Sequence, residues 1–254
     1  GASPLYIACH EGHVAIARLL LENGADVEQT EKDGCSPLYI ASLKGHFGVA
    51  RLLLANGADV NKAANDGVSP LYVACEENHV DVVRLLLAKG ADVHKASKGF
   101  TPLYLSSENN DVELTRVLID NGADVNRANN DGASPLLIAF HNNHVEVATL
   151  LLDTGASIEQ ATNQGLWPLY VACRQGHVDV GALLVEKGAD VNRAMTHRGA
   201  TPLSTAVFTG AVDLARVLLN AGADVDQTDK NGLSPLFMAS RQGNIDIVRL
   251  LLEK

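Results

Sequence analysis

Every proline in this chain marks the same point of one repeating unit. A Gly lies three residues before each proline and a Leu follows it, and successive prolines are 33, 33, 32, 33, 33, 34 and 33 residues apart. The eight are Pro4, Pro37, Pro70, Pro102, Pro135, Pro168, Pro202 and Pro235. A fixed period of this length is typical of repeat architectures, so we expect an array of similar units.

Each unit has the sequence pattern of two short helices. Ser or Thr precedes seven of the eight prolines, as expected for a capping residue followed by proline at the first helical position. The first helix should end about eight residues later, at a Gly or Asn that accepts the left-handed conformation. A second helix follows, and then a segment such as GADVN that leads to an Asp-Gly or Asn-Gly turn. Helices this short are unstable alone, so the units should stack into an all-α solenoid.

The repeated phrases SPLYIA, SPLYVA, TPLYLS and SPLFMA, together with GHVAIARLLLENGADVE, resemble the ankyrin repeat over residues 1–254. The one systematic departure is Tyr in place of the His that follows Pro-Leu. The resemblance implies helix pairs with projecting β-turn fingers, and a curved groove formed by fingers and first helices.

We expect a single domain, 1–254, of eight repeats. The first lacks most of its finger, and the last is truncated after its second helix. The apolar outer faces of these terminal repeats predict end-to-end self-association.

Composition excludes several classes of function. The net charge of −10 argues against nucleic-acid binding, which requires clustered Lys and Arg. No apolar run approaches the length of about 20 residues that crosses a membrane. Three of the four cysteines share one repeat position, where a small apolar side chain fills space. Reduced thiols and the lack of a signal peptide predict a cytoplasmic or nuclear protein, or one in the host-cell cytosol if the chain is a secreted effector.

The reactive side chains follow the repeat and do not converge on one place. Five histidines that begin the second helices are interpreted as structural: His13, His46, His79, His144 and His177. We therefore predict no catalytic residue, no metal site and no cofactor. Three asparagines in DVN segments resemble hydroxylation acceptors of ankyrin proteins: Asn61, Asn126 and Asn192. We favour the simpler interpretation, a turn asparagine that bonds its local backbone.

Positions that vary between repeats are not needed to stabilise the stack. They form two stripes, one at the finger tips and one at the ends of the first helices. Their charge runs from acidic (Glu11, Glu76, Glu77, Glu108) to basic (Arg174, Arg198, Arg241). Apolar residues gather in the later repeats, with Phe140 and Phe208 on first helices. The predicted partner-binding residues are Phe100, His141, Leu166, Arg174, Arg198, Phe208 and Arg241.

These observations predict a non-catalytic scaffold, not an enzyme, that binds a protein or peptide in the groove. A peptide of opposite polarity at its two ends would match the charges. The alternatives are the recognition region of a larger ligase, channel or secreted effector, and an engineered ankyrin binder. The second is disfavoured by irregular framework residues such as Ser106 and Thr149.

Trp167, the only tryptophan, occupies the capping position of the sixth repeat. One interpretation makes it an anchor in the groove. The other, which we favour, makes it a structural filler for the space left where neighbouring repeats lack an aromatic residue two positions after proline, above all over Ser204.

Overall fold

The computed structural model describes residues 2–254, which form helix pairs without any strand; one isolated antiparallel bridge joins Ser97 and Phe100. The helices are α1 (Pro4–His10), α2 (Val14–Glu22), α3 (Pro37–Leu43), α4 (Phe47–Ala55), α5 (Pro70–Glu76), α6 (Val80–Ala88), α7 (Pro102–Glu108), α8 (Val112–Asp120), α9 (Pro135–His141), α10 (Val145–Asp153), α11 (Pro168–Gln175), α12 (Val178–Glu186), α13 (Pro202–Thr209), α14 (Val212–Asn220), α15 (Pro235–Gln242) and α16 (Ile245–Leu252). The all-α array of helix pairs expected from the sequence is confirmed.

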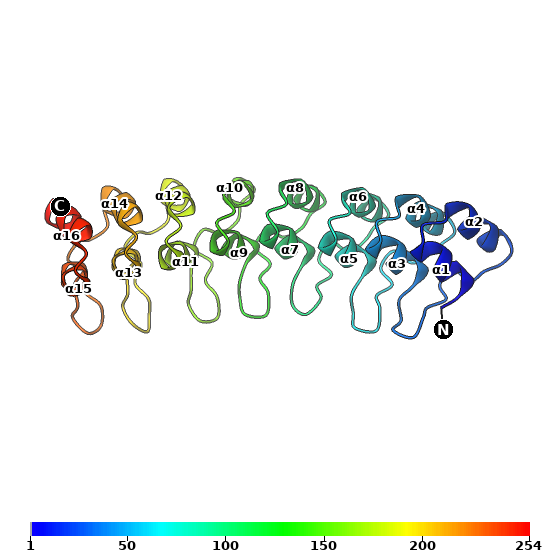
Figure 1. The fold of residues 1–254 in the computed structure, drawn as a ribbon, viewed down its shortest axis with the longest axis horizontal. Helices are drawn as coiled ribbons and strands as arrows, with labels where there is room; N and C mark the ends of the chain where they lie inside the picture. The colour runs from blue at the N-terminus through cyan, green and yellow to red at the C-terminus, as the bar shows by residue number, and fades with distance from the viewer. Residues whose placement is uncertain (1) are drawn as a thin grey trace. The chain divides into compact units, whose positions relative to one another are not determined.

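The chain divides into two compact units, and each is a stack of helix pairs. The first ends at Asp124 and contains α1–α8, and the second, Val125–Lys254, contains α9–α16. Inside each unit the odd-numbered helices pack on one another in a row, and the even-numbered helices form a second row beside them (Figure 1). The fingers, which are the loops that precede the odd-numbered helices, project beyond the first row (Figure 1).

The boundaries of the first helices follow the local sequence. The Ser36 hydroxyl accepts a hydrogen bond from the Tyr39 backbone N–H at 3.1 Å, and the Ser or Thr before six other prolines does the same in its own repeat. After the first helices the chain turns left-handed, for example at Gly45 with φ 70° and at Asn78 with φ 56°. The predicted caps and helix ends are confirmed.

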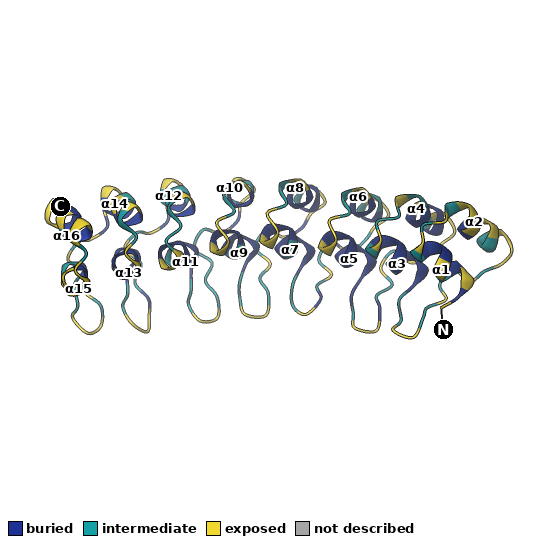
Figure 2. Ribbon diagram, in the orientation of Figure 1, coloured by how far each residue is buried: buried dark blue, intermediate teal, exposed yellow. Residues whose placement is uncertain are grey.

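The core lies between the two rows of helices. The Leu that follows proline is at most 1% exposed in the first seven repeats, as at Leu38 and Leu136, and most odd-numbered helices add a buried Ala (Figure 2). In α7 this Ala is replaced by Ser106, whose hydroxyl accepts a bond from Thr115 at 2.9 Å and donates to the Leu103 carbonyl. The pair satisfies its own polar groups, so the buried hydroxyls cost little.

Adjacent repeats are joined at the start of most fingers, by an arrangement that we call the finger clamp. The Asn61 side chain accepts from the Asp92 N–H at 2.8 Å and donates to the Gly90 carbonyl at 3.2 Å. Asn126 and Asn192 make the same two bonds to Ser157 and Gly155 and to Asp224 and Gly222. The interpretation of these asparagines as local turn residues is therefore wrong, because their side chains bond the backbone of the next repeat.

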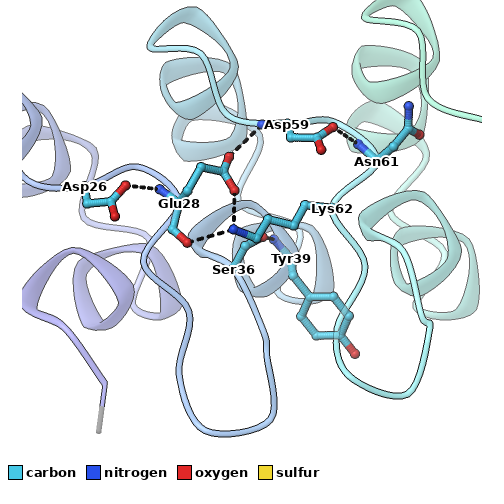
Figure 3. A network of polar contacts seen from close by, with 7 residues as sticks. All are labelled: Asp26, Glu28, Ser36, Tyr39, Asp59, Asn61 and Lys62. Atoms are coloured by element: carbon cyan, nitrogen blue, oxygen red, sulfur yellow. Dashed lines mark hydrogen bonds and ion pairs between the residues drawn. The ribbon is translucent and has the colours of Figure 1, made fainter.

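Two clamps use Glu in place of Asn. Glu28 accepts from the Asp59 N–H at 2.7 Å, and its carboxylate also pairs with Lys62, whose ammonium reaches the Glu28 carbonyl (Figure 3). Glu159 and Arg193 repeat this arrangement in the second unit. A carboxylate cannot donate to the next repeat as an amide does, so each of these two Glu side chains forms an ion pair with a cation of that repeat instead.

The finger clamp predicts that a backbone N–H of the next repeat exchanges its hydrogen faster when the Asn side-chain amide is removed. In Asn61→Ala the Asp92 N–H loses its acceptor, so its hydrogen exchange should accelerate about tenfold, corresponding to roughly 1.4 kcal/mol for one net hydrogen bond. The measurement is hydrogen exchange resolved by residue, with Asn109→Ala, an exposed helix-end asparagine, as the matched control. Equal exchange at Asp92 in the two variants would show that the clamp contributes nothing.

Candidate functional site

The variable residues at the ends of the first helices form one row in the second unit. The Gln175 side chain bonds the His141 ring at 3.0 Å, and the Thr209 hydroxyl donates to the Cys173 carbonyl at 3.1 Å. The Gln242 amide donates to the Phe208 carbonyl at 2.9 Å. These bonds link α9, α11, α13 and α15 in sequence, so the helix-end residues are neighbours.

Most of the predicted binding residues in this unit are exposed. His141, Arg174, Phe208 and Arg241 stand in the helix-end row, and the Phe208 side chain is the most accessible large apolar group described, at 70% exposure. We call these four residues, with Leu166 and Arg198 from the fingers, the finger–helix surface. Leu166 is half-buried and Arg198 is exposed. The contacts described for the fingers do not join these two side chains to the row.

One apolar residue expected in the groove lies elsewhere. Phe140 is fully buried, because position 140 on α9 is the repeat position that Cys9, Cys75 and Cys173 occupy in the core. The expectation that Phe140 belongs to an apolar groove is therefore wrong. In the first unit, Phe100 is half-buried against Tyr104, with ring centroids 4.9 Å apart. Glu11, Glu76, Glu77 and Glu108 are exposed there, so this unit presents acidic groups.

The repeated histidines make bonds between repeats. Nε2 of His46 lies 2.9 Å from the His10 carbonyl, and Nε2 of His79 lies 3.1 Å from the Leu43 carbonyl. His177 makes the equivalent contact with His141. Each ring thus meets the otherwise unpaired carbonyl at the end of the preceding first helix. This geometry gives His46, His79 and His177 a place in the stack.

Trp167 is buried, with 3% of its surface exposed. Its ring lies 5.6 Å from that of Tyr170, and the Arg193 guanidinium stands over the indole at 4.8 Å. Ser204, the partner expected from the sequence, instead completes a reciprocal pair of capping bonds with Thr201. The ring contact and the cation–π contact described for the indole thus come from its own helix and from the Glu159–Arg193 clamp.

The cysteines are free thiols in a reduced state, and three of them are buried. Burial raises the pKa of the Cys9 thiol to about 12 and moves the pKa values of Cys75 and Cys173 still higher. Burial and the adjacent Glu31 raise the pKa of Cys35, which is half-buried in a finger, to about 11. None of the four is poised as a nucleophile, because thiolate formation is disfavoured at each.

Within residues 2–254, no group of three or more His, Cys, Asp or Glu side chains is arranged to hold a metal ion. None of the helices described there has the length and apolar character required to cross a bilayer.

The sequence did not predict a pocket of about 420 Å³ in the first unit, lined among others by Tyr39, Tyr72 and Phe100. Two signals in the sequence point to it. Tyrosines recur at one position of successive first helices, and the finger before Phe100 is one residue shorter than the others.

A family model described as ankyrin repeats (3 copies) matches the chain at residues 1–64, 61–129, 126–195 and 192–254. No curated protein matches the chain at a significant level. The four matched segments together cover the whole repeat array.

The environment of Trp167 predicts its fluorescence. Since the indole is buried, emission should be blue-shifted and resistant to acrylamide. Arg193→Ala removes the group that covers the ring and should shift emission to the red, whereas Arg198→Ala, the matched control in the same finger, should not. A native spectrum like that of free tryptophan would contradict this packing.

Thiol reactivity should follow burial and pKa. At pH 8 the native protein should react slowly with Ellman's reagent, chiefly at Cys35, and all four thiols should react after denaturation. Because the pKa of Cys35 is raised to about 11, its rate should increase as the pH rises toward that value. Cys35→Ser should abolish the native reaction; a rapid reaction of two or more thiols in the folded state would refute this account.

Proposed function

Because this chain belongs to the ankyrin-repeat family, whose repeats generally bind other proteins, we propose that it is a non-catalytic scaffold that holds a protein or peptide. The finger–helix surface of the second unit is its main contact area, and Phe100 contributes from the first unit. The scaffold works in the cytoplasm or nucleus, where its four thiols stay reduced.

The observation that carries this proposal is the exposed Phe208 ring in a row of charged residues. Because 70% of the Phe208 surface is exposed, covering the ring with a partner would stabilise the complex. Aromatic rings flanked by Arg are frequent anchors of interfaces. Arg174 lies on α11 and Arg241 on α15, on either side of α13, which carries Phe208. The combination favours a partner segment that offers an apolar side chain between carboxylates.

The contact can be located by cross-linking. A photoreactive phenylalanine at position 208 should capture a protein from lysate, while the same group at position 47, an exposed phenylalanine on α4, should not. The captured protein, identified by mass spectrometry, then serves as the ligand for binding measurements. Equal capture at both positions would contradict the assignment of this surface.

We expect Phe208→Ala and Arg174→Ala each to weaken binding of that ligand by more than about 1 kcal/mol, or roughly fivefold in Kd. The melting temperature should hardly change, because both side chains are exposed. Phe47→Ala and Arg216→Ala, exposed positions on second helices, are the matched controls. Normal binding by both surface variants, or unfolding of both, would refute the proposed surface.

A further inference from the structure

The pocket of the first unit is built by three successive repeats. Tyr39 comes from α3, Tyr72 and Glu76 from α5, and Glu108 from the end of α7. Asp66 and Phe100 enter from the two fingers between these helices. The volume of about 420 Å³ is open to solvent and large enough for one long side chain of a partner.

The short finger shapes this pocket. Ser97 and Phe100 exchange two backbone hydrogen bonds, of 3.0 and 2.9 Å, around Lys98 and Gly99. Both central residues are left-handed, with φ 52° and 88°, as the tight two-residue hairpin turn requires. Phe100 therefore stands immediately beside the cap Thr101, where its ring meets Tyr104 and borders the pocket. Other fingers close over longer loops, such as the one between Ala64 and Val68.

The chemistry of the lining favours a cation. Three carboxylates, Asp66, Glu76 and Glu108, face a single ammonium group, that of Lys98. The lining also includes three aromatic rings, whose faces attract cations. The carboxylates also act on Tyr72. Burial, as the main cause, and the charges of Glu76 and Glu108 together raise the pKa of Tyr72 to about 12.

We propose that this pocket binds the guanidinium group of an arginine in a basic segment of the partner. The flat guanidinium stacks on an aromatic face while its N–H groups donate to the carboxylates, which a lysine ammonium cannot match in both respects. The inference deepens the proposed function, since Phe100 takes part in both. It can nevertheless be tested alone, because a short peptide should bind the pocket without any contact to the second unit.

The test is an amide-resolved NMR titration of the full chain with acetyl-Gly-Arg-Gly-amide. Saturable shifts should be confined to the pocket, at the amides of Ser97–Phe100 and Asp66–Val68. The peptide with Lys in place of Arg should bind at least about threefold more weakly. Peptides with Gln or Glu at that position should not bind detectably.

Paired variants separate the pocket from general surface charge. Glu76→Gln should weaken the arginine peptide at least about fivefold, since it removes a charged acceptor. Glu77→Gln is the matched control, because Glu77 is the exposed neighbour outside the lining, and binding should stay within about twofold. Phe100→Leu, which keeps an apolar group but no ring, should also weaken binding. Arg174→Ala should leave it unchanged.

Several results would overturn the inference. These are equal effects of Glu76→Gln and Glu77→Gln, equal binding of the Gln and Arg peptides, tighter binding of the Glu peptide, or shifts that map to the second unit. Failure of the arginine peptide to bind would refute the pocket while leaving the finger–helix surface untouched. Loss of protein binding in Phe208→Ala with intact peptide binding would support both proposals.

Discussion

No helix described in this chain exceeds nine residues, and helices of this length do not persist alone in water. Each helix pair therefore depends on contacts with the repeats beside it. The leucine-rich core supplies the non-directional part of this dependence. The directional part comes from side chains that reach into the adjacent repeat, such as Asn61 to the Asp92 N–H and His46 to the His10 carbonyl. Two of the recurring side chains, the clamp Asn and the His, thus serve the neighbouring repeat.

The clamp position accepts either an amide or a carboxylate. Asn126 donates and accepts through its amide, whereas Glu159 only accepts and is joined by Arg193 of the next repeat. Arg193 in turn covers Trp167, which stands where other repeats have a capping hydroxyl. The indole Nε1 is buried without a hydrogen-bond partner among the described residues, so apolar and cation–π contacts, not polar ones, must offset the lost cap. Exchanges of this kind let irregular repeats share one backbone.

The features that the sequence predicted correctly depend on residues close together in the chain. Caps such as Ser36, left-handed ends such as Asn78 and the buried leucines follow from spacing within one repeat. The errors concern partners about one repeat away. The Asn61 side chain could not be assigned to Asp92 because 31 residues separate them. The position of the Arg193 guanidinium over Trp167 was likewise not predicted. Phe140 is buried although it is aromatic, because its repeat position is a core position.

In the row at the helix ends, the main chain of a residue can stabilise the stack while its side chain remains available to a partner. The carbonyl of His141 accepts from His177, and the carbonyl of Phe208 accepts from Gln242, so the backbone at both positions is fixed by the next repeat. The side chains of these same residues remain exposed. The Phe208 side chain can change without loosening the stack, because the bond from Gln242 uses only the carbonyl of Phe208. A rigid backbone also lowers the entropy lost when a partner is bound. The bonds that hold the array together therefore also prepare its variable side chains for recognition.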